Sequence, residues 1–378
     1  MDKRRIMVIA GEASGDLHAS HLVRAIGTRA PDIEFVGIGG ARMKEAGVEL
    51  IYDNRELAVT GFTEVLSKVR TIWQAYREVK TTLQRLRPDL LILLDFPDFN
   101  FMVGKAAKKM GIPVVYYISP QVWAWRQGRI AVIRKMVKKI LVILPFEASL
   151  YGDKGVFVGH PLLDEIGETG PPEEIRKRYG VETASRVVAL LPGSRRNEVV
   201  QLLPVMVKAA ELIEKRFPGT AFLIPVAPTI GAEDIAAEIA KSPVPLIPVQ
   251  EKAYDTLRIA DFAVVASGTA TLETAIMGTP MVILYRVSPF TFFLAKRLVK
   301  VPHIGLINMV AGERIVPELL QNDVTPEAVA AEAVKILEDR EYARRVTEQL
   351  KEASDRLGRP GASRRAAEVV VDLMEAAP

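Results

Sequence analysis

The sequence predicts an α/β protein made of two doubly wound domains. Short apolar segments typical of strands alternate with segments whose apolar residues recur at helical spacing. This alternation occurs twice, and a stretch rich in glycine and proline at residues 167–172 separates the two series. The chain has 378 residues, which is more than one typical core accommodates. We therefore expect two facing parallel sheets with a cleft between them.

The first series occupies residues 1–166. Its clearest strand is residues 90–94 (LLILL), which is apolar throughout, as expected for a parallel strand covered on both faces. Ahead of it, apolar residues at helical spacing predict a helix over residues 69–87, which Pro88 ends. The predicted strands are residues 6–10, 33–38, 90–94, 114–118, 140–144 and 156–158.

The second series occupies residues 173–345 and repeats the architecture without repeating the sequence. After Asn308 and the segment GERIVPELLQ (residues 312–321) we expect helices without strands, and the last helices, residues 346–378, should return to the first domain. Residues 290–300 (FTFFLAKRLVK) predict an amphipathic helix that either lies on a membrane or spans the cleft. The predicted strands are residues 186–191, 221–226, 262–265 and 281–285, and the long helix is residues 199–217.

Composition excludes several classes of protein. The chain contains no cysteine, which excludes disulfides, cysteine-ligated metal sites and cysteine nucleophiles. Its four histidines show no zinc-ligand spacing, so no metal site is expected. A net charge of +4 is too small to argue for nucleic acid, but it fits phosphorylated substrates or an anionic membrane surface. No apolar stretch approaches the about 20 residues that span a bilayer, and the first apolar run is too short for a signal peptide, so we expect a cytoplasmic protein.

The stretch ASGTATLETAIMGTP, residues 266–280, predicts a nucleotide site in the second domain. It contains the end of a buried strand, a turn of small residues and the start of a helix. Ser267, Gly268 and Thr269 can cap that helix, whose N-terminus suits a phosphate. Glu273 lies one turn further in and suits the paired hydroxyls of a ribose. The alternative is an ordinary joint between a strand and a capped helix.

A second turn, Gly193-Ser194-Arg195, follows the strand at residues 186–191. Arg195 therefore stands at the carboxyl end of a strand and beside a helix N-terminus. An arginine in this place can bind a diphosphate through paired, charge-assisted hydrogen bonds.

The first domain carries polar residues at the ends of two strands. The turn GEASGD includes Glu12 and Ser14 but is not the glycine fingerprint of dinucleotide-binding proteins. Ser14 and the following Asp16 are either functional groups or helix caps. Asp95 follows five apolar residues, so partial desolvation would raise its pKa and make it a better general base, unless it is a cap or a structural hydrogen-bond acceptor. Asp98 is the competing candidate base.

Aromatic and basic residues gather near the same strand ends. The apolar members either line a groove for an apolar ligand or pack between loops as part of the core. They are Phe96, Phe99, Phe101, Met102, Trp123 and Trp125. The basic run that begins at Arg126 is either a solvated face or a patch that binds anions or a membrane surface.

Six motifs in this order resemble the lipid-A-disaccharide synthase family over nearly the whole chain. They are GEASGD, DFPDFN, SPQVWAWRQGR, LLPGSRRNEV, ASGTATLE and YRVSPFT with LAKRLVK. The resemblance implies a GT-B glycosyltransferase with two Rossmann-like domains, which needs no metal or other cofactor. It would join UDP-2,3-diacylglucosamine to 2,3-diacylglucosamine 1-phosphate (lipid X), release UDP and form a β-1,6-linked disaccharide. It would work at the cytoplasmic face of the inner membrane.

The resemblance also implies roles for residues. Asp95 would be the catalytic base, with Ser14 supporting it and Glu12 as a further catalytic candidate in the same turn. Arg195, Glu273 and Asn308 would belong to the nucleotide side. That side would also include Gly193, Ser194, Ser267, Gly268 and Thr269. The apolar residues from Phe96 to Trp125, with Arg126, would contact the acceptor, its acyl chains or the membrane. His18 is given no role.

These roles suggest a single in-line displacement with inversion, in which Asp95 takes the proton of the acceptor 6-hydroxyl. The closest alternative is another GT-B enzyme that uses a UDP-N-acetyl sugar, such as a 2-epimerase or the peptidoglycan transferase. A non-catalytic nucleotide- or membrane-binding module is a second alternative. The missing glycine fingerprint disfavours a dehydrogenase.

Overall fold

The computed structural model describes residues 4–57, 62–167, 169–250, 253–288, 291–292 and 301–376. The chain divides into two compact units, one formed by Met1–Glu165 with Gly358–Pro378 and the other by Ile166–Leu357. Apart from Thr291 and Phe292, the helix predicted at residues 290–300 lies outside the described residues. The prediction of two doubly wound α/β domains is confirmed. The cleft between them stays a prediction.

The first unit contains a seven-stranded sheet in the order β3-β2-β1-β4-β5-β6-β7. Every pairing in it is parallel. The strand order reverses between β1 and β4, and in such sheets ligands bind beyond the carboxyl ends of the strands at this switch point. The strands are β1 (Arg5–Ala10), β2 (Glu34–Gly39), β3 (Val48–Asp53), β4 (Leu90–Leu94), β5 (Val114–Tyr117), β6 (Lys139–Val142) and β7 (Gly155–Phe157).

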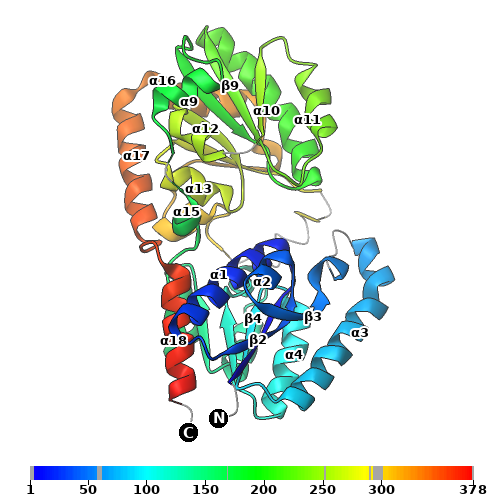
Figure 1. The fold of residues 1–378 in the computed structure, drawn as a ribbon. Helices are drawn as coiled ribbons and strands as arrows, with labels where there is room; N and C mark the ends of the chain where they lie inside the picture. The colour runs from blue at the N-terminus through cyan, green and yellow to red at the C-terminus, as the bar shows by residue number, and fades with distance from the viewer. Residues whose placement is uncertain are drawn as a thin grey trace. The chain divides into compact units, whose positions relative to one another are not determined.

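Helices cover both faces of this sheet (Figure 1). The helices α1 (Ala13–Arg29) and α18 (Ala362–Glu375) share one core with Leu90, Ile92 and Leu94 of β4, whereas Leu91 and Leu93 face the core on the other side. This two-sided burial explains why β4 is apolar throughout. The helices of the second face are α3 (Phe62–Leu86), α4 (Pro97–Lys109) and α6 (Gly128–Met136). Shorter helices are α2 (Ala41–Glu45), η1 (Asn54–Glu56), α5 (Val122–Trp125), α7 (Glu147–Tyr151), η2 (Gly152–Lys154) and α8 (Leu162–Glu165).

The C-terminal helix α18 belongs to the first unit, but the preceding helix does not. The Asp164 carboxylate accepts hydrogen bonds from the backbone N–H groups of Gly361 and Ala362, which fixes the start of α18. By contrast, α17 (Arg340–Asp355) packs against helices of the second unit. The expected division at residue 345 therefore falls inside α17, and the segment that joins the first unit begins at Gly358.

The second unit contains a six-stranded parallel sheet in the order β10-β9-β8-β11-β12-β13, which reverses between β8 and β11. The expectation of helices without strands after residue 321 is confirmed for the described residues, and just before them β13 pairs with β12. The strands β3, β10 and β13 were not predicted, since each is an edge strand that mixes polar with apolar residues. The strands are β8 (Arg186–Leu191), β9 (Thr220–Val226), β10 (Leu246–Gln250), β11 (Phe262–Ala266), β12 (Met281–Tyr285) and β13 (Glu318–Leu320).

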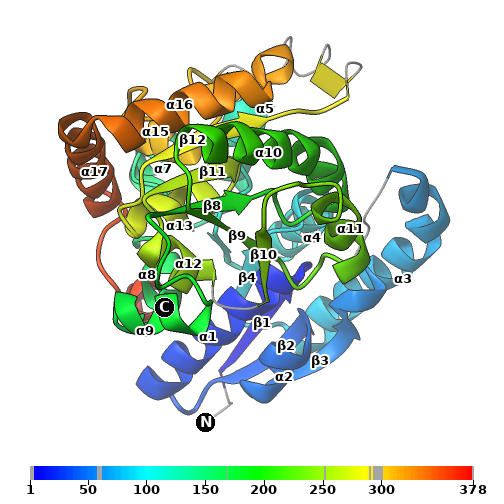
Figure 2. The same cartoon turned by 90° about the horizontal axis from the view of Figure 1, so that it is seen from above.

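Helices cover both faces of the second sheet as well (Figure 2). On one face lie α10 (Arg196–Arg216) and α16 (Pro326–Glu338), and on the other α9 (Pro172–Arg178), α12 (Ala253–Ile259) and α13 (Ala270–Ile276). The remaining elements are α11 (Ala232–Ile239), α15 (Leu306–Ala311) and η3 (Gln321–Asp323). None of the helices in the described ranges is long and apolar enough to cross a bilayer.

Two glycines of the first unit should respond in opposite ways to substitution by alanine. A Cβ at Gly37 in β2 would overlap the backbone of Val8 in β1, whereas a Cβ at Gly27 in α1 would meet nothing. Gly27→Ala should therefore raise the free energy of unfolding by about 0.5–1 kcal/mol. Gly37→Ala should lower it by several times that amount or prevent folding. Thermal and urea unfolding of the two variants measure both effects, and equal effects would contradict the β1–β2 packing.

Candidate active site

The switch point of the first unit brings together Glu12, Ser14 and Asp95. The last residues of β1 and β4, Ala10 and Leu94, are paired in register, so the turns that follow them meet. Ser14 and Glu12 both lie close enough to the Asp95 carboxylate to change its pKa, which the Ser14 hydroxyl lowers and the Glu12 charge raises. Sequence reasoning placed these three residues at strand ends. The structure places them within reach of one another.

An unusual backbone turn aims Asp95 at α1. Asp95 and Phe96 both adopt left-handed conformations, with φ values of 45° and 46°. Each such residue costs about 1–3 kcal/mol unless its surroundings hold it in place. Here the carbonyl oxygen of Asp95 accepts hydrogen bonds from Asn100 Nδ2 at 2.5 Å and from the Tyr116 hydroxyl at 2.8 Å. Asn100 Nδ2 also donates to the carbonyl oxygen of Leu94 at 2.9 Å, so one buried amide fixes both carbonyls of the turn.

Gly11 makes room for this turn. A Cβ at Gly11 would overlap the ring of Phe96, which stacks on the ring of Phe99 at a centroid distance of 4.9 Å. The first glycine of GEASGD therefore permits close packing against the DFPDFN segment. This packing also brings the Ser14 turn next to Asp95.

The environment of Asp95 suits a general base. Burial and, to a smaller extent, the negative charge of Glu12 raise the pKa of the Asp95 carboxyl, the nearby Ser14 hydroxyl lowers it, and the net result is a pKa of about 6. At neutral pH the carboxylate is therefore mostly ionised yet more basic than an ordinary aspartate. A base whose pKa lies near the working pH transfers protons efficiently.

The other two aspartates of these motifs have different partners. The Asp16 carboxylate is buried and accepts hydrogen bonds from the backbone N–H groups of Gly40 at 2.7 Å and Met43 at 3.1 Å, so it caps α2. The Asp98 side chain is 75% exposed and pairs with Arg129 at 2.5 Å and Arg126 at 3.6 Å. Neither carboxylate shares the desolvated turn of Asp95.

Three of the aromatic residues expected at a membrane or acyl groove belong to the core instead. Phe99, Phe101 and Trp123 are buried, and Trp123 Nε1 donates to Glu147 Oε1 at 2.8 Å. The prediction was wrong for these residues because Phe99 and Phe101 lie in α4 and Trp123 lies in α5, so segments interpreted as loops are helical and turn one side inward. Phe96 is partly buried. Met102 and Trp125 are exposed, and Arg126 lies 4.1 Å from the centre of the Trp125 ring.

The switch point of the second unit holds the turn that carries Arg195. The strands β8 and β11 are neighbours, with Leu191 paired to Val265, so the turns after them lie at one edge of the sheet. The Arg195 side chain is 78% exposed, and its Nη1 donates to Glu198 Oε1 at 2.9 Å. Glu198 Oε2 accepts from the backbone N–H groups of Ser194 at 3.1 Å and Arg195 at 3.2 Å. Two backbone N–H groups at the start of α10 are therefore already engaged by a carboxylate.

The turn after β11 differs from the sequence interpretation. Ser267 Oγ donates to the carbonyl oxygen of Ile304 at 3.0 Å, and within the described part of the chain no side chain caps α13. The expected capping by Ser267 and Thr269 is thus wrong. Gly268 has a φ of 151° and open space where a Cβ would stand, and Thr269 is exposed. Glu273 lies one turn into α13 and is half-buried.

Asn308 is a structural residue of the second unit. Its side chain is fully buried, and Nδ2 donates to Val316 O at 2.9 Å and Glu318 Oε1 at 2.8 Å. Its Oδ1 accepts from the backbone N–H groups of Ile315 and Val316 at 3.0 and 3.1 Å. A direct contact with a nucleotide would break these bonds. Asn308 therefore shapes the loop whose Ile304 carbonyl accepts the hydrogen bond from Ser267.

Sequence reasoning missed three residues that shape the two sites. Asn100 and Tyr116 hold the Asp95 turn, and no local pattern identifies them because they reach it from α4 and β5. Glu198 was detectable, since an acidic residue three positions after a helix cap is the spacing of a capping box.

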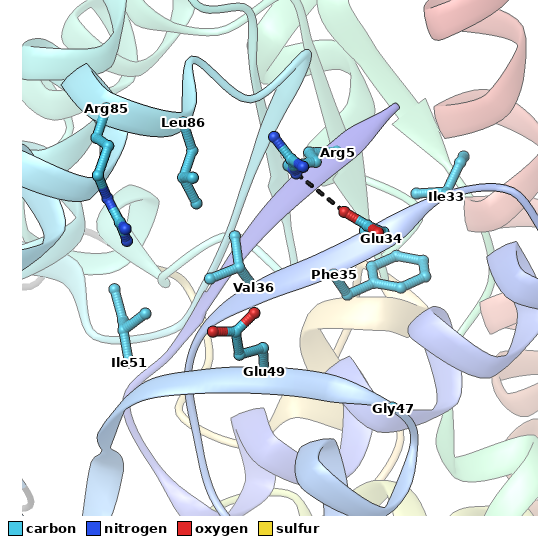
Figure 3. A pocket seen from close by; sticks show the side chains of 10 residues that line it. All are labelled: Arg5, Ile33, Glu34, Phe35, Val36, Gly47, Glu49, Ile51, Arg85 and Leu86. Atoms are coloured by element: carbon cyan, nitrogen blue, oxygen red, sulfur yellow. Dashed lines mark hydrogen bonds and ion pairs between the residues drawn. The ribbon is translucent and has the colours of Figure 1, made fainter. Parts of the chain in front are cut away.

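A cavity of about 500 Å³ lies at the opposite edge of the first sheet (Figure 3). It opens beside the first residues of β1 and β2, where Arg5 Nε and Glu34 Oε2 are 3.0 Å apart. Ligands of parallel sheets bind at the carboxyl ends of the strands, so this cavity does not belong to the site around Asp95. Among the side chains that the structure describes, no group of three histidine, aspartate or glutamate residues is arranged to hold a metal ion.

The fold is that of the GT-B proteins. UDP-GlcNAc 2-epimerase from Neisseria meningitidis, solved with UDP-GlcNAc, superposes with a TM-score of 0.64 and 12% identity, covering 97% of this chain and all of its own. The calicheamicin glycosyltransferase CalG4 gives a TM-score of 0.63 and 15% identity, with 100% of both chains covered. At these identities the likeness concerns the fold alone.

Sequence comparison identifies the family. Residues 6–371 match the family model described as lipid-A-disaccharide synthetase, so the chain belongs to that family, whose members are glycosyltransferases. The lipid-A-disaccharide synthase of Syntrophus aciditrophicus is 46% identical over 99% of both chains. That of Geobacter metallireducens is 44% identical over 98% of this chain and 97% of its own. The resemblance seen in the six motifs is confirmed.

The raised pKa of Asp95 should make stability depend on pH. Because the folded pKa of about 6 exceeds the ordinary value, the folded state loses stability as the pH rises through 6. Asp95→Asn removes this loss. It should raise the free energy of unfolding by about 1–2 kcal/mol at pH 8 and by little at pH 4. Asp98→Asn is the control, since it makes the same substitution at an exposed carboxylate of the same segment. Urea unfolding across this pH range tests both variants, and parallel curves for them would contradict the buried environment of Asp95.

Proposed function

We propose that this protein joins an acylated UDP-glucosamine to an acylated glucosamine 1-phosphate, in the manner of its family. The substrates are UDP-2,3-diacylglucosamine and 2,3-diacylglucosamine 1-phosphate, and the products are the β-1,6-linked disaccharide 1-phosphate and UDP. Membership in the family supports this assignment. The observation that carries it is the partly desolvated Asp95, which lies beside Ser14 and Glu12 at the switch point of the first unit.

The proposed reaction is one displacement at the anomeric carbon. Asp95 removes the proton of the acceptor 6-hydroxyl while that oxygen forms a bond to the donor C1. The bond between C1 and the UDP oxygen breaks, and UDP leaves with the electron pair. A single displacement converts the α-linked donor into a β-glycoside through an oxocarbenium-like state, as in glycoside hydrolysis.

Arg195 is the proposed group that stabilises the charge of the leaving UDP. The backbone N–H groups of Ser194 and Arg195 already bond to Glu198, so the guanidinium carries this task. A helix N-terminus contributes only about 0.3–2 kcal/mol, which is small for a leaving group. We propose that the reaction needs no metal, in which case a chelator leaves the rate of UDP release unchanged.

Asp95→Asn tests the assignment of the base. The variant should fold and bind UDP like the wild type but release UDP about 100- to 10,000-fold more slowly when both acylated sugars are present. Asp98→Asn is the matched control, because it removes the same charge from a carboxylate paired with Arg126 and Arg129, and it should keep most of the rate. Near-normal turnover of Asp95→Asn would assign the base elsewhere. Absence of UDP release by the wild type would refute the proposed function itself.

We also propose that the first unit contacts the cytoplasmic face of the inner membrane, where acylated sugars reside. Seven large hydrophobic side chains are exposed among those that the structure describes, and five of them lie in this unit. They are Val69, Trp73, Met102, Trp125 and Val132. Arg77 lies over Trp73 and Arg126 over Trp125, and arginine beside tryptophan suits an anionic membrane surface.

Binding to lipid vesicles tests this contact. The double variant Trp73→Ser with Trp125→Ser should bind vesicles that contain anionic lipid about tenfold more weakly than the wild type, because each ring loses apolar area that would be buried. Val200→Ser is the control, since Val200 is 60% exposed but belongs to the second unit. Equal binding by all three proteins, or no binding by the wild type, would contradict the proposed contact.

A further inference from the structure

The turn that carries Arg195 is closed by one side chain, that of Glu198. Both carboxylate oxygens are engaged: Oε2 accepts from Ser194 N and Arg195 N, and Oε1 accepts from Arg195 Nη1. The exposed fraction of the Glu198 side chain is 27%, against 78% for Arg195. A well-fixed carboxylate therefore holds an otherwise exposed guanidinium.

The rest of the turn is fitted to this carboxylate. Gly193 has a φ of 110°, and a Cβ there would overlap Glu198 Oε2. On the other side of the turn, Thr229 Oγ1 donates to the carbonyl oxygen of Ser194 at 2.6 Å. Gly193 thus makes room for the Glu198 carboxylate.

Glu198 also lies on the rim of the switch point. Burial raises the pKa of Tyr285, the last residue of β12, and the negative charge of Glu198 raises it further. The carboxylate therefore stands near the carboxyl ends of β8 and β12, on either side of β11. It is placed to act on whatever Arg195 binds there.

We infer that Glu198 is a positioning residue, which holds the guanidinium of Arg195 ready for the phosphates of a nucleoside diphosphate. The inference rests on the proposed function, in which Arg195 binds the diphosphate of the donor. An arginine has five N–H donors, and the bond to Glu198 uses one of them. The remaining donors stay available in a fixed orientation, which lowers the entropy that binding must remove. Recognition of the diphosphate then comes from the Arg195 side chain, because the N–H groups of the turn are occupied.

The same contacts allow an opposite role, which predicts an opposite sign. If the Glu198 carboxylate occupied the place of a phosphate, the diphosphate would have to displace it. Removal of the carboxylate would then make UDP bind more tightly. A positioning role requires that removal of the carboxylate weakens UDP binding.

Calorimetric titration of the full chain with UDP separates the two roles. We expect Glu198→Ala to weaken UDP binding about tenfold, which is within the usual coupling between residues in contact. Glu198→Gln, which keeps an acceptor oxygen, should lie between that variant and the wild type. In turnover, the KM for the UDP-sugar should rise while the KM for the lipid acceptor stays unchanged.

Glu214→Gln is a matched control for stability. Glu214 lies near the other end of α10, where Oε1 accepts from Gly219 N and Oε2 from Thr220 N, each at 3.0 Å. Like Glu198, it engages two neighbouring backbone N–H groups. The variant Glu214→Gln should lower the unfolding temperature about as much as Glu198→Gln does, without changing the affinity for UDP. If the role of Glu198 were merely structural, Glu198→Gln would also lower the unfolding temperature and leave the affinity for UDP unchanged.

The double variant shows whether Glu198 acts through Arg195. In a chain that already carries Arg195→Ala, Glu198→Ala should have no further effect on UDP affinity. Tighter binding by the single variant, or the same weakening in both backgrounds, would overturn the inference. Absence of UDP binding by the wild type would refute the proposed function. A wild type that binds UDP, with an effect of Arg195→Ala but none of Glu198→Ala, would refute only the positioning role.

Discussion

The two hydrogen bonds to the carbonyl oxygen of Asp95 are the contacts on which the first site depends. Asn100 supplies one from the inner face of α4 and Tyr116 supplies the other from the buried strand β5, and they hold two consecutive residues in left-handed conformations. The turn aims the carboxylate at α1, where burial and Glu12 raise its pKa and the Ser14 hydroxyl lowers it. With an ordinary backbone conformation at Asp95 and Phe96, the carboxylate would not lie at α1. The raised pKa of Asp95 therefore depends on the left-handed turn.

The two units use the same sheet order for opposite electrostatic purposes. At the switch point of the first unit, burial and the charge of a second acidic residue both raise the pKa of a carboxylate, which keeps it basic. At the switch point of the second unit, a carboxylate is paired with an arginine and with two N–H groups, so the guanidinium is fixed in place. Parallel sheets of this order provide the position, and the side chains around each position decide its chemistry.

Most of the fold could be predicted from the sequence because strands covered on both faces are apolar throughout. The segments at residues 90–94, 186–191 and 281–285 coincide with β4, β8 and β12. The edge strands β3, β10 and β13 were missed because an edge strand is only partly covered, so its sequence alternates or contains charges. The end of the second unit was misplaced for a related reason, since α17 and α18 have similar amphipathic patterns but pack on different units.

By itself, the sequence determined the family, the position of Asp95 and Arg195 at strand ends, and the exclusion of cysteine chemistry. These features follow from which residues are present and from their neighbours along the chain. Only the tertiary structure decided which side chains are free to act: it buried Phe99, Phe101 and Trp123, turned Ser267 toward Ile304, enclosed Asn308 and paired Asp98 with arginines. The physical reason is that exposure, pKa and hydrogen bonding depend on neighbours from distant segments, such as Asn100 and Tyr116 around Asp95.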